Sequence, residues 1–213
     1  MPDSRRNRER RSGRRSPFIE PKPLILVVCE GAVTEKEYLK GFANWFRNQQ
    51  ISIKPFEIAE EFGRASLSLV REAKRLKQAA ENKADGEGDP NLRYDSVWCV
   101  FDVDDHPDIP NAREMARDNG IELAISNPCI ELWLLLHFRG NPGMQHRDRV
   151  REMLTTFVPG HDKHVDFKKD YAPGYEQAVS YAKTLDQLAE RDGEDGRNPT
   201  TGVYRLTSLI RGE

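Results

Sequence analysis

The most constraining feature of the sequence is a run of six apolar residues, LILVVC, at positions 24–29. A continuous apolar run rich in β-branched residues is typical of a strand buried on both faces, as in a parallel sheet covered by helices on each side. It is also the longest unbroken apolar stretch in the chain, far short of the ~20 residues that cross a bilayer. We therefore expect an α/β protein without a membrane span.

Strand-like and helix-like segments alternate after this run. Further buried strands are expected at 97–101 and 121–125, a weaker strand at 51–59, and helices at 34–46, 66–82, 111–119 and 127–138, with a loop from Asp85 to Asn91. Thr34 and Glu37 have the spacing of a capping box, and Asn127-Pro128 fits the start of a helix. This alternation predicts a small parallel sheet flanked by helices.

The pattern changes after about residue 140. Helices are expected near 149–157, 174–191 and beyond Asn198-Pro199, which we interpret as a helix N-cap. We divide the chain into an α/β domain over 21–140 and a helical extension over 141–213 packed on it.

Residues 1–20 form a basic N-terminal arm that we expect to be disordered. Seven of the first fifteen residues are arginine, against two acids, whereas the whole chain has a net charge of −2, so the remainder is acidic. Such an arm either contacts nucleic-acid phosphates or only keeps the protein soluble.

The cysteines indicate the compartment. Cys29, Cys99 and Cys129 lie far apart in the sequence and form no CxxC pair. A disulfide framework or a structural zinc site is therefore not expected, and a reducing cytoplasm is the default location.

Acidic residues follow two of the buried strands. Glu30-Gly31 comes directly after the first. Asp102 and Asp104 follow the strand at 97–101, and their side chains point to the same side if this segment is extended. The carboxyl ends of parallel strands meet at one edge, where converging carboxylates repel one another unless a cation joins them. Hard oxygen ligands favour Mg²⁺ or Mn²⁺. The alternative is that these acids only cap helices or solvate turns.

Glu131 lies in the first turn of an expected helix that is apolar almost all round. Burial of an unpaired carboxylate is costly, so we expect a metal ion, a lysine, an arginine or backbone amides as its partner. His137, on the same helix, is interpreted as a packed and hydrogen-bonded histidine rather than a ligand.

Lys168 and Lys169, close to Tyr171, form a basic segment with an aromatic residue. A lysine there is a candidate for neutralising phosphate charge in a transition state. The alternative is an exposed loop.

Taken in order, these motifs resemble the RloB-like family, a group of bacterial proteins usually placed with Toprim-type nucleases. The matching stretches are CEG at 29–31 with Thr34, Glu35 and Tyr38, FDVDDH at 101–106, SNP at 126–128 with ELW at 131–133 and HF at 137–138, Lys168 or Lys169 with Tyr171, and NPTT at 198–201 with Val203. The resemblance implies a Toprim-like fold in which Glu30, Asp102 and Asp104 hold Mg²⁺, with Glu131 completing or supporting the site. It also implies a phage-defence (abortive infection) setting with an ATPase partner.

We therefore expect a Mg²⁺- or Mn²⁺-dependent nuclease that acts on RNA, including tRNA, or on DNA. The expected catalytic residues are Glu30, Asp102, Asp104, Glu131, Lys168 and Lys169. Two alternatives stay open: a non-catalytic subunit that binds nucleic acid or an ATPase, and a nucleotidyl- or glycosyl-transferase whose DxD holds a metal-bound diphosphate.

Overall fold

The computed structural model describes residues 24–59, 65–103 and 108–213. The expected basic arm and Asp104 lie outside these residues. The described part contains a five-stranded sheet with the order β2-β1-β3-β4-β5, in which β5 is antiparallel to its neighbour and the other strands are parallel. The strands are β1 (Ile25–Cys29), β2 (Phe56–Ile58), β3 (Ser96–Asp102), β4 (Glu122–Asn127) and β5 (Thr200–Thr201).

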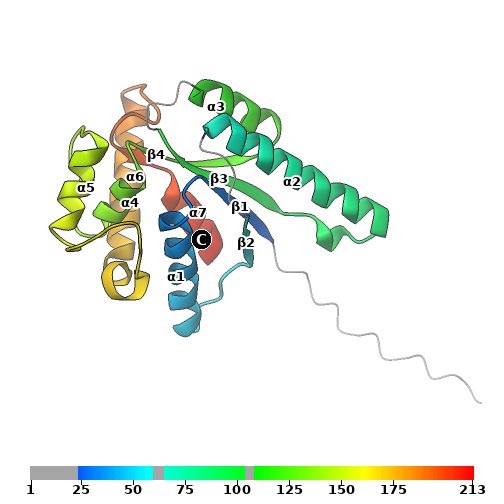
Figure 1. Cartoon of the computed structure of the whole chain (residues 1–213), viewed down its shortest axis with the longest axis horizontal. Helices are drawn as coiled ribbons and strands as arrows, with labels where there is room; N and C mark the ends of the chain where they lie inside the picture. Colours follow the sequence, from blue (N-terminus) through cyan, green and yellow to red (C-terminus); the bar gives the residue numbers. More distant parts are fainter. Residues whose placement is uncertain (1–23, 60–64, 104–107) are drawn as a thin grey trace, which may run out of the picture.

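Seven α-helices in the described residues surround the sheet (Figure 1). They are α1 (Thr34–Asn48), α2 (Ser66–Glu87), α3 (Ile109–Asp118), α4 (Ile130–Leu136), α5 (Arg147–Thr155), α6 (Tyr175–Arg191) and α7 (Val203–Arg211). A π-helical turn, η2 (Phe167–Tyr171), precedes α6. No helix among the described residues is long and apolar enough to cross a membrane.

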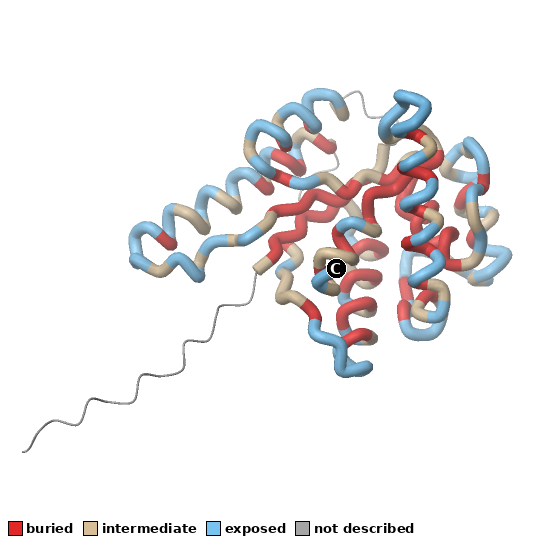
Figure 2. The backbone as a smooth tube through the Cα atoms, turned by 180° about the vertical axis from the view of Figure 1, so that it is seen from behind, coloured by how far each residue is buried: buried red, intermediate tan, exposed pale blue. Residues whose placement is uncertain are grey.

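The apolar run of β1 is buried on both faces, as predicted. Ile25, Val27 and Cys29 pack into a core shared with α1, α4, α6 and α7, whereas Leu26 and Val28 pack into a second core under α2 and α3. Figure 2 shows the sheet as the most deeply buried layer of the molecule. The predicted α/β class is confirmed.

The C-terminal third is not purely helical. Thr200–Thr201 forms β5 beside Ser126–Asn127, and the Thr201 and Ser126 hydroxyl oxygens lie 2.9 Å apart. The expected helix start at Asn198-Pro199 is therefore wrong, because these residues lead into a strand and α7 begins at Val203. Residues beyond 140 thus complete the sheet as well as cover it.

Several element boundaries also differ from the prediction. Helix α2 continues to Glu87, past the expected loop start at Asp85, and ends where Gly88 adopts a left-handed conformation that glycine accepts without strain. Strand β2 covers only Phe56–Ile58 of the expected 51–59. Asn127 ends β4, and its side chain donates to the Gly196 carbonyl instead of capping α4, which begins at Ile130.

The predicted capping box at the start of α1 is wrong. Thr34 is already helical, and its hydroxyl donates to the Lys163 carbonyl at 2.9 Å. The Glu37 carboxylate accepts from the Val165 amide at 2.8 Å and lies 2.9 Å from His164 Nδ1. The side chains that could have bonded locally instead hold a distant segment of chain against α1.

Candidate functional site

The carboxyl ends of β1 and β3 lie side by side, and they bring Glu30 and Asp102 together. The Glu30 amide donates to the Val100 carbonyl at 2.9 Å, which continues the parallel pairing one residue beyond β1. The Glu30 carboxylate in turn accepts from the Asp102 amide at 3.3 Å. Both residues are partly buried. Asp104, the other acid of the DxD motif, lies outside the described residues.

Glu131 reaches the same edge from α4. Its side chain is only 6% exposed, and its Oε1 accepts from Arg151 Nε of α5 at 2.9 Å. Burial by itself raises the pKa of Glu131, but the neighbouring Cys129 thiol and Arg151 outweigh burial and hold the pKa below its usual value. The buried carboxylate therefore stays charged, and its partner is an arginine, one of the alternatives that the sequence allowed.

The other carboxylate oxygen of Glu131, Oε2, is buried and has no hydrogen-bond partner among the described residues. A buried charged oxygen without a donor is rare in folded proteins, because it loses its hydration without compensation. This oxygen is available to a ligand of positive charge.

Glu35 is a fourth acid at this edge, which the residue-by-residue reading of the sequence did not single out. It is 6% exposed in the first turn of α1. Burial raises its pKa, and the nearby charges of Glu30 and Glu131 raise it further. The only signal for it was its place in the family motif, because an acid in a first helical turn usually needs no other explanation.

Gly31 makes room for Glu35. A Cβ atom at position 31 would lie 1.9 Å from Glu35 Oε2, so the Glu35 carboxylate would have to move to admit it. A backbone hydrogen bond from Gly31 also counteracts the rise in the pKa of Glu35. The glycine after Glu30 therefore serves to seat a second carboxylate beside the first.

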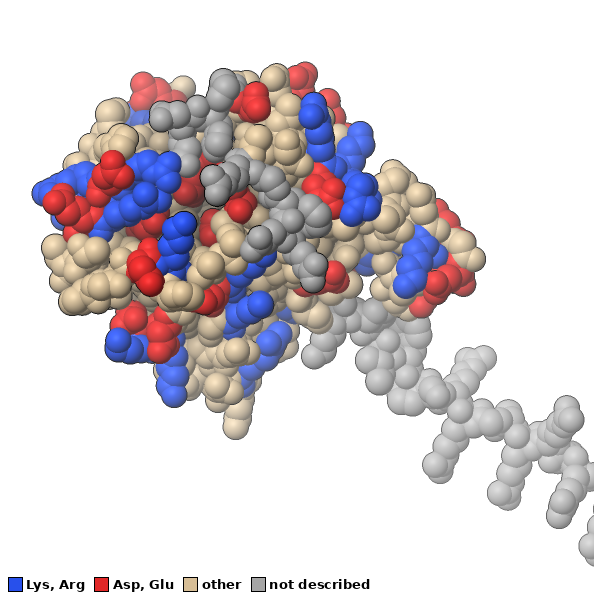
Figure 3. Space-filling view, viewed as in Figure 1, with Lys and Arg blue, Asp and Glu red and all other residues tan. Residues whose placement is uncertain are grey.

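We call Glu30, Glu35, Asp102 and Glu131 the acidic rim. Figure 3 shows acidic side chains near the middle of this face, with basic side chains to the left over α5 and below over α1. The effect of Glu30 and Glu131 on the pKa of Glu35 shows that the rim carboxylates repel one another. A divalent cation relieves such repulsion.

The donor chemistry of the acidic rim fits Mg²⁺ or Mn²⁺. Glu30, Asp102 and Glu131 are three of the four ligands expected from the sequence, all with hard oxygen donors, and Glu131 Oε2 has no donor among the described residues. Within the described ranges, no three His, Cys, Asp or Glu side chains are already arranged to hold a metal ion. These carboxylates could hold one together with Asp104.

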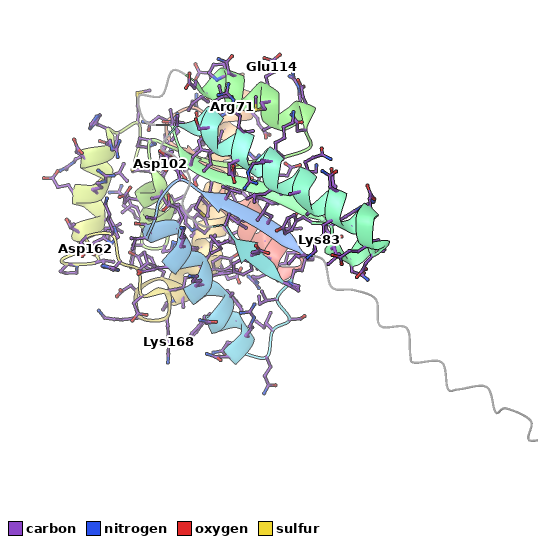
Figure 4. The ribbon with its side chains drawn as sticks, turned by 45° about the vertical axis from the view of Figure 1, so that its right-hand side comes forward. Arg71, Lys83, Asp102, Glu114, Asp162 and Lys168 are labelled. Atoms are coloured by element: carbon purple, nitrogen blue, oxygen red, sulfur yellow. The ribbon has the colours of Figure 1, made fainter. Side chains whose placement is uncertain are left out.

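The structure does not bring Lys168 to the acidic rim. Lys168 and Lys169 lie on η2, which packs beside α1, and both side chains are exposed. In Figure 4, Lys168 lies well away from Asp102, at the lower edge of the molecule. Lys169 Nζ lies 3.6 Å from Asp170. Tyr171, by contrast, is buried in the core.

His137 is a buried structural residue, as the sequence indicated. Its Nδ1 lies 3.0 Å from the Trp133 carbonyl, and its Nε2 lies 3.1 Å from the Tyr38 hydroxyl. Nδ1 needs a proton to bond the carbonyl, so in the neutral ring Nε2 accepts from the Tyr38 hydroxyl. Burial lowers the pKa of His137 to about 4, which keeps the ring neutral near pH 7.

A cleft of about 500 Å³ lies at the outer edge of β4, between α3 and α6. Both signs of charge line it, including Arg113, Arg117, Asp186 and Glu190. Asp186 already accepts from the Tyr204 hydroxyl at 3.0 Å and from Arg205 at 2.5 Å. No sequence pattern indicated this cleft, because its walls come from segments far apart in the chain.

Comparison with known proteins gives one match. A family model described as RloB-like protein matches residues 25–210. No curated protein and no solved structure matches the chain. The match covers every described strand and all of the acidic rim.

Proposed function

The chain belongs to the RloB-like family, and we propose that it is a metal-dependent nuclease that cleaves phosphodiester bonds of RNA, such as tRNA, or of DNA. One observation carries the proposal. Carboxylates from β1, β3 and α4 converge at one edge of the sheet, and a buried oxygen of Glu131 there has no donor among the described residues. This is the arrangement expected for divalent-metal phosphodiester chemistry.

The carboxylates of Glu30, Asp102 and Glu131, together with Asp104, would hold Mg²⁺ or Mn²⁺. Bound there, the ion supplies positive charge for the phosphate oxygens and lowers the pKa of a coordinated water. The chain itself orients the ligands: the Asp102 amide holds the Glu30 carboxylate, and Arg151 holds Glu131. Such fixed carboxylates lose little entropy when the reacting groups bind.

The biological setting that we propose follows from the family resemblance. It is a cytoplasmic effector of a phage-defence (abortive infection) system that works with an ATPase partner. The sequence agrees with a need for a partner, because the chain beyond its basic arm is acidic and repels nucleic acid at long range.

The direct test is cleavage of single-stranded and duplex RNA and DNA, including tRNA, with Mg²⁺ or Mn²⁺. Asp102→Asn and Glu30→Gln keep the side-chain size but remove the charge, and each is expected to lower the cleavage rate by at least about 100-fold. Asp118→Asn is the matched control, since Asp118 is 60% exposed and pairs with its neighbour Arg117. Full activity in both rim variants would refute this site.

Calorimetric titration with Mn²⁺ separates the nuclease from the alternative of a non-catalytic binding subunit. The nuclease proposal predicts heat of binding in the wild type that is lost in Asp102→Asn and kept in Asp118→Asn. Absence of both metal binding and cleavage in the wild type would favour the binding subunit.

A further inference from the structure

Among the described residues, Arg151 forms an ion pair with Glu131 of the acidic rim. Its Nε donates to Glu131 Oε1 at 2.9 Å, while its Nη1 lies 3.9 Å from Asp148, one turn earlier on α5. The Arg151 side chain is 39% exposed, whereas the Glu131 side chain that it contacts is 6% exposed. The Arg151 side chain therefore lies between a buried carboxylate and solvent.

Arg151 brings its positive charge to the acidic rim through its bond to Glu131 Oε1. A phosphodiester that enters the acidic rim brings a further negative charge to the same place. Arginine suits this position because its planar fork can donate to a carboxylate and a phosphate at once.

We propose that Arg151 binds a non-bridging phosphate oxygen of the nucleic-acid substrate while its Nε keeps Glu131 in place. This inference rests on the proposed nuclease function. It gives Arg151 the phosphate-binding role that the sequence suggested for Lys168 and Lys169, whose side chains lie on the exposed η2 turn.

Arg149 provides a matched control on the same helix. It is 58% exposed and pairs with Glu152 at 2.5 Å. Arg149→Gln therefore removes the same charge from α5 without touching the acidic rim. If only the general loss of positive charge mattered, Arg149→Gln and Arg151→Gln would weaken binding equally.

The first test measures binding of a fluorescent 20-nucleotide RNA or DNA to variants that also carry Asp102→Asn, at several salt concentrations. Arg151→Gln is expected to weaken binding about tenfold and to reduce the salt slope by about one, whereas Arg149→Gln changes neither. Arg151→Lys keeps the salt slope and loses part of the affinity, because lysine keeps the charge but not the fork. Equal affinities and slopes for Arg151→Gln and Arg149→Gln would overturn the inference.

A second test distinguishes phosphate binding from simple neutralisation of Glu131. Arg151→Gln leaves a buried carboxylate unpaired, so we compare Glu131→Gln with the double variant Glu131→Gln/Arg151→Gln, after melting curves show that both fold. Phosphate binding predicts that the double variant binds about tenfold more weakly than Glu131→Gln alone. Equal binding by these two variants would leave Arg151 with a structural role only.

The experiments distinguish a failure of the nuclease proposal from a failure of the role proposed for Arg151. Cleavage by the wild type with unchanged binding in Arg151→Gln keeps the nuclease and overturns the role of Arg151. Arg151-dependent binding without any cleavage by the wild type keeps the phosphate contact and overturns the nuclease.

Discussion

The two ends of α4 each bury a titratable side chain, and the surroundings of the two side chains differ. At the C-terminal end, both ring nitrogens of His137 have partners, and aromatic rings including Tyr38, Trp133 and Tyr171 pack around it. At the N-terminal end, Glu131 has a partner on one oxygen and none among the described residues on the other. A buried polar group with all its bonds made is explained by the fold, whereas one with a bond missing points to a ligand.

The largest expected effect is at the N-terminal end of α4. Glu131→Gln should lower the cleavage rate about 100- to 1000-fold, because a charge facing the reacting phosphate is lost. The free energy of unfolding should change by less than ~1 kcal/mol, since the partly exposed Arg151 can be hydrated once it loses its partner. Parallel measurement of cleavage and chemical denaturation checks this split. A large loss of stability with normal cleavage would mean that Glu131 supports the fold and takes no part in the reaction.

The second effect is a pH dependence at the C-terminal end. The pKa of His137 lies near 4 in the folded protein, below the ordinary value of 6.5, so the unfolded chain binds the proton first as the pH falls. The contribution of His137 to the free energy of unfolding is therefore highest above about pH 6.5. It falls by on the order of 3 kcal/mol as the pH drops toward 4, because the unfolded chain takes up the proton that buried His137 does not accept.

Denaturation of the wild type and of His137→Asn across this pH range isolates that contribution. The difference in unfolding free energy between the two should shrink as the pH falls. A difference that does not change with pH would contradict the neutral, buried histidine.

Tyr38→Phe removes the hydroxyl that donates to His137 Nε2 and leaves that nitrogen buried without a donor. We expect a loss of about 1–3 kcal/mol in the free energy of unfolding. Cleavage at a temperature where the variant is folded should be unchanged. If cleavage falls by more than the loss of folded protein accounts for, the His137 end of α4 also affects the acidic rim.

The last prediction compares two glycine substitutions, of which Gly86→Ala has the smallest expected effect of all. Gly31→Ala puts a Cβ into the Glu35 carboxylate and should reduce cleavage sharply. Gly86→Ala meets nothing within 4 Å in helix α2 and should stabilise the protein by at most ~1 kcal/mol, with normal cleavage. Equal cleavage rates in the two variants would show that the site does not depend on Gly31.

Much of the acidic rim was predictable because parallel strands follow a simple rule. Once the runs ending at Cys29 and Asp102 are identified as neighbouring parallel strands, Glu30 and Asp102 must meet at one edge. The burial of Glu131 followed from the apolar residues around it on α4. Glu35 was not predictable from its position, because burial of a first-turn acid depends on what packs over the helix.

The sequence by itself determined the α/β class, the doubly buried strands and the edge where the acids gather, since strand and helix periodicities are local properties. The tertiary structure alone decided that Arg151 pairs with Glu131, that Thr34 and Glu37 bind the segment 163–165, and that Thr200–Thr201 completes the sheet. These contacts join residues 20 to 129 positions apart. They depend on how whole elements pack, which no local pattern encodes.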